Sequence, residues 1–336
     1  MMSQTRNSSY KKLFLLWESS EDMFEKEVLG RILTDYLKNH RNEFSAYDKL
    51  LHEFRKPECP ECHSNNFIKY GKNRNGTLRY LCKECGKTFN CASDTLFFSS
   101  KVNIVAWFSF LECLLNGTSV RSACITAKIS TVTGTAWMKK IFYTLRNYQE
   151  SIVLNETIWI DETYVHEDSS KIYLLEEIGK IKKVRKQPRG ISRNKICILI
   201  ATDKENSFAE IVCHGRPQRV PNHNICRKHI KTGSHLIGDE DNSLTYAANK
   251  MNLTRTMYKS NTEEAYRNLE PVDQLCARLK FFIDKHRGFK KELLQDYLNL
   301  FIFIDNEKKT DGDLYKVTIK LLKLMCEQTK SGLDIN

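Results

Sequence analysis

The sequence predicts a multidomain α+β protein, and three patterns carry this prediction. Apolar residues recur at helical spacing near the N-terminus, four cysteines form two closely spaced pairs, and two short apolar runs each end on an aspartate. The chain has 336 residues, of which 41% are hydrophobic. That length suggests two or three domains, with enough apolar material for a real core.

The charge balance is strongly basic, with 53 Lys and Arg against 41 Asp and Glu and a net charge of +12. Such a balance favours a polyanionic partner, although a merely soluble basic protein would look the same. No apolar run approaches the ~18 residues of a membrane span, and the N-terminal run ended by Glu18 is too short for a signal-peptide core. We therefore expect a cytoplasmic protein with no membrane partner, whose 12 cysteines are not a disulfide framework.

Residues 1–55 read as a helical N-terminal segment. Its apolar positions recur at helix spacing and are Phe24, Val28, Leu29, Ile32, Leu33, Tyr36 and Leu37. The segment is either a docking or dimerising arm or an ordinary packed helical hairpin.

Residues 56–92 read as a zinc ribbon. The knuckles Cys59-Pro60-Glu61-Cys62 and Cys82-Lys83-Glu84-Cys85 would supply four thiolates for tetrahedral zinc. Between them, 67–71 and 78–81 resemble two strands around a polar turn. Basic residues in the ribbon are consistent with contact to phosphate.

Residues 100–150 read as a trio of helices, expected at 104–115, 120–127 and 132–145. A short helix, a tight turn and a second helix suit helix-turn-helix DNA binding, with Lys139 and Lys140 as candidate DNA contacts. An ordinary three-helix core would have the same pattern.

Residues 155–306 read as the core domain. Ile158, Trp159 and Ile160 suit a buried strand that ends at Asp161, and 196–201 and 208–212 return as a meander. A further short strand, Leu236-Ile237, ends near Asp239 and precedes a helix from about Ser243. Two separate strands are therefore expected to end in carboxylates.

Between two of these strands lies a basic loop, residues 180–195, which is interrupted by Pro188 and Gly190. It is either a solvated loop or a contact to the nucleic-acid backbone, and we favour the second. Its basic residues are Lys180, Lys182, Lys183, Arg185, Lys186, Arg189, Arg193 and Lys195.

A third acid, Asp273, lies near the start of an amphipathic helix predicted at 271–283. The chain should then be helical from 289 to about 304. The polar stretch 305–313 should break that helix, and a last helix should run from 314 to about 326 in a C-terminal tail, 307–336.

Three acids on two strands and a following helix can gather two divalent cations, because carboxylates are the ligands that Mg²⁺ or Mn²⁺ prefers. Two such cations can activate a water or a 3′-hydroxyl and stabilise the leaving oxygen in phosphoryl transfer. A meander, another strand and a helix bearing the last acid follow the order of an RNase H-like nuclease core.

From about residue 59 to 306, the sequence resembles bacterial insertion-sequence transposases that have an N-terminal zinc ribbon and a DDE-type RNase H-like domain. The motifs that carry the resemblance are the two cysteine knuckles, Asp161-Glu162-Thr163-Tyr164, Arg189-Gly190-Ile191-Ser192-Arg193, Asp239 with Asn242-Ser243, Asp273 with Arg278-Leu279-Lys280, Gly288-Phe289 and Leu294-Gln295-Asp296-Tyr297-Leu298-Asn299. The resemblance implies that Asp161, Asp239 and Asp273 are the catalytic, metal-binding triad. It also implies binding to double-stranded DNA at transposon ends and target, in a nucleoid-associated homo-oligomer that holds two ends together.

The sequence departs from the family's pattern in two places. The third acid is Asp273 where Glu is usual, and Asp239 is followed by Glu240 where Gly is common. Glu240 or Asp241 is thus a possible substitute ligand, and either departure could mark an inactive copy. Glu162 is a further candidate, although neighbouring strand residues point to opposite faces, so only one of Asp161 and Glu162 should face the metals.

The function that these residues imply is DNA cleavage and strand transfer by two-metal phosphoryl transfer. Two other functions remain open. One is a zinc-ribbon DNA-binding protein with a silent core, which would keep the cysteines and tolerate loss of the acids. The other is an RNase H-like nuclease that does not transpose.

Overall fold

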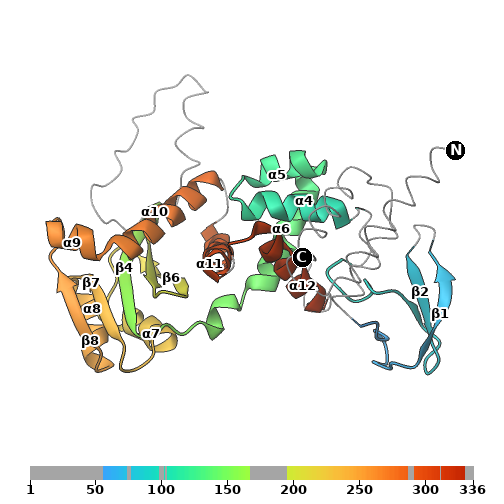
Figure 1. The fold of residues 1–336 in the computed structure, drawn as a ribbon, viewed down its shortest axis with the longest axis horizontal. Coiled ribbons are helices and arrows are strands. Elements are labelled where there is room, and N and C mark those ends of the chain that lie inside the picture. Colours follow the sequence, from blue (N-terminus) through green and yellow to red (C-terminus); the bar gives the residue numbers. More distant parts are fainter. Residues whose placement is uncertain are drawn as a thin grey trace, which may run out of the picture. The chain divides into compact units, whose positions relative to one another are not determined.

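The structure is a computed structural model that describes residues 56–73, 77–97, 102, 104–166, 195–286, 291–310 and 312–329 (Figure 1). The predicted N-terminal helices and almost all of the basic loop lie outside the described residues. The chain divides into two compact units, Met1–Lys140 with Asp313–Asn336, and Ile141–Gly312. Among the described helices, none is both long and apolar enough to cross a bilayer.

The first unit contains a small antiparallel sheet in the order β1-β2-β3. Its strands are β1 (Phe67–Lys72), β2 (Leu78–Cys82) and β3 (Thr88–Phe89). The two strands expected between the cysteine knuckles are therefore present, and Phe67 lies opposite Cys82. Phe67, Tyr80 and Phe89 pack their rings with centroids 5.1–5.5 Å apart, which gives this small sheet its apolar core.

The described helices of the first unit follow the expected bounds closely. They are α4 (Ile104–Leu115), α5 (Val120–Ala127), α6 (Thr131–Leu145), which crosses the unit boundary, and α12 (Leu314–Glu327). Ser119 caps α5 by accepting a hydrogen bond from the Ser122 amide at 3.2 Å, and Lys128 in the left-handed conformation ends it. Trp107 of α4 and Trp137 of α6 stack at 3.7 Å.

A glycine permits the close packing of α5 on α6. A Cβ atom at Gly134 would lie 2.2 Å from the Cys124 sulfur, a distance that no side chain could accept without movement. The short α5, the tight turn at 128–130 and α6 thus form the compact helical pair that the sequence predicted.

The second unit is built on a five-stranded mixed sheet in the order β6-β5-β4-β7-β8 (Figure 1). Its strands are β4 (Thr157–His166), β5 (Lys195–Thr202), β6 (Ser207–His214), β7 (His235–Asp239) and β8 (Thr254–Tyr258). β4, β5 and β6 form the antiparallel meander, whereas β7 pairs parallel to β4 and β8 pairs parallel to β7.

The helices of this unit contact the sheet in two groups. They are η1 (Tyr148–Ser151), α7 (Arg219–His229), α8 (Asn242–Lys250), α9 (Glu263–Asn268), α10 (Glu270–Lys285), η3 (Lys291–Leu293) and α11 (Leu294–Thr310). α7 packs on α8 and β6, while α10 packs on β4 and β5, and α11 on β6. α7, β8 and α9 were not predicted from the sequence, because they are short and polar.

Two sequence predictions are wrong in this unit. β4 does not end at Asp161 but continues through Glu162 to His166, because β5 pairs with it along that whole length. α11 does not break at Asp305 but runs to Thr310. Its polar residues find partners across the fold: Arg278 donates to the Asp305 carboxylate at 2.8 and 3.0 Å, and Asn306 accepts from the Ser207 amide at 2.7 Å.

The unit begins at Ile141, earlier than the predicted start at 155. The reason lies in Gln149 of η1, whose buried side chain donates to Ala209 and Asn299 and accepts from the Ala209 amide. These bonds fix η1 to β6 and α11, so the segment before β4 belongs to the same folded unit.

Candidate functional site

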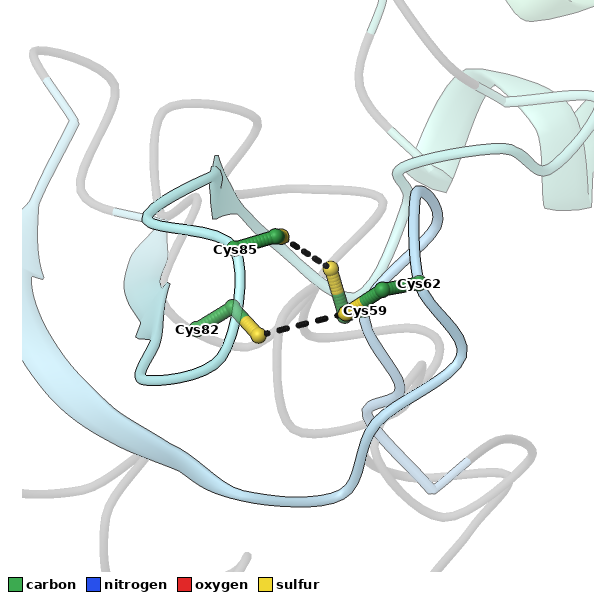
Figure 2. Close-up of side chains that lie close together, drawn as sticks. All are labelled: Cys59, Cys62, Cys82 and Cys85. Carbon is green, nitrogen blue, oxygen red and sulfur yellow. Dashed lines mark hydrogen bonds between the residues drawn. The ribbon is translucent and has the colours of Figure 1, made fainter.

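Four cysteines converge at the end of the small sheet (Figure 2). The sulfurs of Cys59, Cys62, Cys82 and Cys85 all lie within 4.8 Å of one another, with Cys59–Cys85 and Cys62–Cys82 at 3.5 Å. A tetrahedral zinc with ~2.3 Å bonds to sulfur requires sulfur–sulfur distances of about 3.8 Å. The cluster could therefore hold a zinc ion with little rearrangement.

The backbone of the first knuckle favours the thiolate form that zinc needs. Burial by itself raises the pKa of Cys59, but hydrogen bonds from the backbone at Cys62 and Glu61 outweigh it and lower the pKa to about 7. The second knuckle turns at Gly86, whose φ of +72° lies in the left-handed region that glycine adopts without strain. Both features come from residues close in sequence.

The second candidate site lies on the larger sheet, where β4 and β7 run parallel. Trp159 is level with Ile237 in that pairing, so Asp161 and Asp239, each two residues further along, lie level on adjacent strands. Because side chains alternate along a strand, the two carboxylates point to the same face. A Cβ atom at Gly238 would lie 3.0 Å from the Ile160 carbonyl oxygen, so a glycine before Asp239 lets the strands approach there.

The third acid arrives on the helix that covers this face. α10 packs on β4 and β5 and carries Asp273 in its first turn. Its Cys276 thiol lies 3.8 Å from the Asp161 carboxylate, which fixes the face of β4 that Asp161 occupies. The structure thus brings Asp161, Asp239 and Asp273 to one side of the sheet.

The three carboxylates repel one another. Burial raises the pKa of Asp161, and the charges of Asp239 and Asp273 raise it further, to about 7. Burial raises the pKa of Asp239, and the charges of Asp241 and Asp273 raise it further. Burial also raises the pKa of Asp273, while the nearby Lys280 charge lowers it in part. This arrangement has the electrostatic character of a cation site, because positive charge would relieve it.

The acids are more widely spaced than the cysteines. Among the described residues, the four cysteines alone have all their ligand atoms within 4.8 Å of one another. Carboxylates of this wider spacing do not form a closed set around one ion.

Glu162 faces the other side of the sheet. Its carboxylate accepts hydrogen bonds from Asn222 of α7 at 2.5 Å, Ser243 of α8 at 2.6 Å and the Tyr164 hydroxyl at 3.0 Å. The expectation that Asp161 and Glu162 cannot both face the metals agrees with this geometry. Glu162 instead joins β4 to the starts of two helices.

Asp241 and Glu240 differ in their surroundings. The Asp241 carboxylate caps α8 by accepting from the Ser243 amide at 2.6 Å, and the Arg216 guanidinium lies 3.9 Å away. Glu240 is exposed, and its backbone amide donates to Tyr258. The capping bond gives Asp241 a structural role, which leaves Asp239 as the stronger candidate ligand.

The predicted DNA contacts fall in two groups. Lys182, Lys183, Arg185, Lys186, Arg189 and Arg193 lie outside the described residues. Of the two lysines on α6, Lys139 is exposed, whereas the Lys140 ammonium donates to the Leu96 carbonyl and lies 5.9 Å from the Trp107 ring centre. Lys139 is therefore better placed than Lys140 to reach a partner.

The sequence analysis missed several groups around the acids. Cys276 lies one helical turn after Asp273, and that spacing could have identified it. Ser260, whose hydroxyl is 3.4 Å from the Asp239 carboxylate, and Asn222, which binds Glu162, come from distant segments. Only the folded sheet brings them to the site.

Comparison with known proteins gives limited matches. No protein-family model matches this chain. A 50-residue stretch, 15% of the chain, is 44% identical to an uncharacterized protein in transposable element ISH50 of Halobacterium salinarum, and it spans 17% of that relative's length.

Two solved structures resemble the chain at low identity. They are a pre-cleavage Mos1 transpososome, with 10% identity and a TM-score of 0.28, and the Mos1 strand transfer complex, with 11% and 0.30. Each alignment covers 66% of this chain and 78% of the other. With TM-scores this low, the two likenesses establish neither fold nor function.

Proposed function

We propose that this protein is a transposase that binds the ends of its element and catalyses metal-dependent DNA cleavage and strand transfer. The observation that carries the proposal is the meeting of Asp161, Asp239 and Asp273 on one face of the sheet, where the charges of Asp239 and Asp273 add to burial in raising the pKa of Asp161. The strand order β6-β5-β4-β7-β8, in which β5 alone runs opposite to the other four strands, supports an RNase H-like core. The short match to a protein of a transposable element points the same way.

The three aspartates would hold two Mg²⁺ or Mn²⁺ ions. Bound there, such ions would activate the attacking oxygen and stabilise the leaving one in phosphoryl transfer. The chain's own contribution is positional: β4 and β7 fix two acids on adjacent strands, and α10 supplies the third. The neutral Cys276 thiol, whose pKa burial and the Asp161 charge raise to about 12, adds no further negative charge.

DNA binding would be divided among several parts of the chain. The four cysteines would hold a structural zinc ion, and the basic residues of the small sheet, Lys139 on α6 and the basic loop at 180–195 would contact the DNA backbone. A homo-oligomer would hold the two ends of the element together.

Strand transfer in vitro tests the proposal. Purified protein, Mg²⁺ and labelled DNA carrying the sequences that flank the gene should give joined products. Asp161→Asn and Asp273→Asn should reduce joining to background, whereas Asp284→Asn, a matched change on α10, should leave it unchanged.

The assay also separates the two other functions. Cleavage without joining of a pre-cut end would indicate a nuclease that does not transpose. Tight DNA binding with no cleavage in Mg²⁺ or Mn²⁺ would indicate a DNA-binding protein with a silent core, for which Asp273 in place of the usual Glu would be the natural explanation.

A further inference from the structure

A pocket of about 520 Å³ lies where α7 and α8 begin. The polar residues that line it are Arg216, Gln218, Arg219, Asp241, Asn242 and Ser243. Its volume falls within the usual range of ligand sites, and its lining combines two guanidinium groups with amide and hydroxyl donors. That set of groups favours an anion with several oxygen acceptors.

The two arginines are available to a ligand. Arg216 keeps 74% of its side chain exposed, and the one ion pair that it forms within the described part of the chain, with Asp241, is long at 3.9 Å. The Arg219 side chain makes no ion pair or hydrogen bond with any residue that the structure describes. Arginine presents a planar fork of donors that matches phosphate oxygens, so two loosely held arginines in one hollow suit a phosphodiester.

The one acid in the pocket is already engaged. Asp241 accepts the Ser243 amide at 2.6 Å and so completes the first turn of α8. At the start of α7, by contrast, Gln218 makes no side-chain capping bond, so the first amides of that helix are left for another acceptor.

The pocket is rigidly tied to the strand that carries Asp161. Glu162, the next residue, accepts from both Asn222 of α7 and Ser243 of α8, and so joins the two walls of the pocket to β4. On the other wall, Asp241 to Ser243 follow directly after Asp239. The pocket is therefore held in a fixed relation to two members of the acidic triad.

We propose that this pocket binds a backbone phosphate of the DNA strand that is cleaved at the acidic triad. The proposal rests on the proposed function and extends it, because it assigns Arg216 and Arg219 the role of positioning the strand. Glu162 is a positioning residue that does not itself touch the DNA, since it fixes the pocket walls relative to Asp161.

The first test measures binding of DNA carrying the element's ends over a range of salt concentrations. Arg216→Ala/Arg219→Ala is compared with Arg227→Ala/Lys231→Ala, which removes the same charge from exposed positions at the other end of α7. Each lost phosphate contact lowers the slope of log affinity against log salt by about 0.9. We expect a slope lower by about 1–2 for the pocket variant and an unchanged slope for the control.

The second test identifies the phosphate. Single phosphates near the cleavage position are replaced by uncharged methylphosphonates, and binding and cleavage are measured. In the wild-type protein, one or two adjacent replacements should weaken both. In the pocket variant, the same replacements should have no further effect, because the partner is already missing. If no single replacement weakened binding or cleavage by the wild-type protein, the proposal would be overturned. It would also be overturned if the replacements weakened the pocket variant as much as they weaken the wild-type protein.

The outcomes separate this inference from the proposed function. If the wild-type protein neither binds nor cleaves the DNA, the proposed function fails and the pocket proposal falls with it. If the wild-type protein cleaves and the pocket variant matches its control, the pocket proposal alone is wrong. Titration with inorganic phosphate tests whether the pocket is instead a site for a free anion. If the pocket variant no longer bound inorganic phosphate but cleaved DNA as well as the wild-type protein, the DNA assignment would be contradicted.

Discussion

The two candidate metal sites are built in opposite ways. The cysteine cluster takes its ligands from two short knuckles, and all four sulfurs already lie within 4.8 Å of one another. The acidic triad takes its ligands from β4, β7 and α10, and the carboxylates repel one another. Local turns place the four cysteine sulfurs close enough to surround one ion. The three aspartates come from distant elements, so their positions depend on the folding of the whole sheet.

The largest effect should come from removing one of the four cysteine ligands. Cys82→Ser should remove bound zinc and unfold the small sheet, because structural zinc contributes about 10–16 kcal/mol to such domains. Zinc content by metal analysis and far-UV circular dichroism check this. Cys113→Ser, which changes a free cysteine outside the cluster, is the control. A full zinc content in Cys82→Ser would show that the cluster is not the zinc site.

A paired acid in the second unit provides the contrast to the triad. Burial alone would raise the pKa of Glu210, but hydrogen bonds from His229 and Lys228 lower it to about 2. Both ring nitrogens of the buried His229 face acceptors, Glu210 and the Ile152 carbonyl, at 2.7 and 2.9 Å. Glu210→Gln should destabilise the protein by about 3 kcal/mol, because it removes the negative charge that the His229 and Lys228 side chains face.

Chemical denaturation at pH 7 measures the Glu210 effect. Since the folded-state pKa is lowered, the contribution is present above pH 4.5 and is lost as the pH falls toward 2. A loss of stability in Glu210→Gln that is the same at pH 3 and pH 7 would contradict this account.

Asp161, which has carboxylates rather than cations around it, should show the opposite pH dependence. The folded-state pKa of Asp161 is raised from 3.8 to about 7, so the native protein holds a proton that the unfolded chain has lost. Without divalent cations, stability should therefore fall between about pH 4 and pH 7, by on the order of 4 kcal/mol. Asp161→Asn should abolish this fall, and Mg²⁺ should reverse it in the wild-type protein only. Thermal unfolding at several pH values, with and without Mg²⁺, is the measurement.

The smallest effect should come from the acid beside the triad. Asn is as good a helix cap as Asp, so Asp241→Asn should change stability by less than about 0.5 kcal/mol and leave strand transfer near the wild-type rate. Asp241→Ala should lose about 1 kcal/mol with the cap. Loss of strand transfer in Asp241→Asn, with stability retained, would instead make Asp241 a metal ligand and widen the triad.

The sequence by itself determined the features that depend on neighbouring residues. The two C-x2-C knuckles, the helices at 104–115 and 120–127 and the strand at 196–201 were all predictable, because turn residues and apolar spacing act over a few positions. The three acids were also found as candidates. Their positions after or within apolar runs gave a signal, and the resemblance to a known family singled them out.

Only the tertiary structure decided how those acids are used. β4 continues past Asp161 because β5 pairs with it to His166, and that continuation turns Glu162 away from Asp161 and toward Asn222 and Ser243. α11 likewise continues through Asp305 because Arg278 reaches it from another helix. In both cases a long-range hydrogen bond overrides the local signal, because a polar group at the edge of a core is stable wherever the fold supplies its partner.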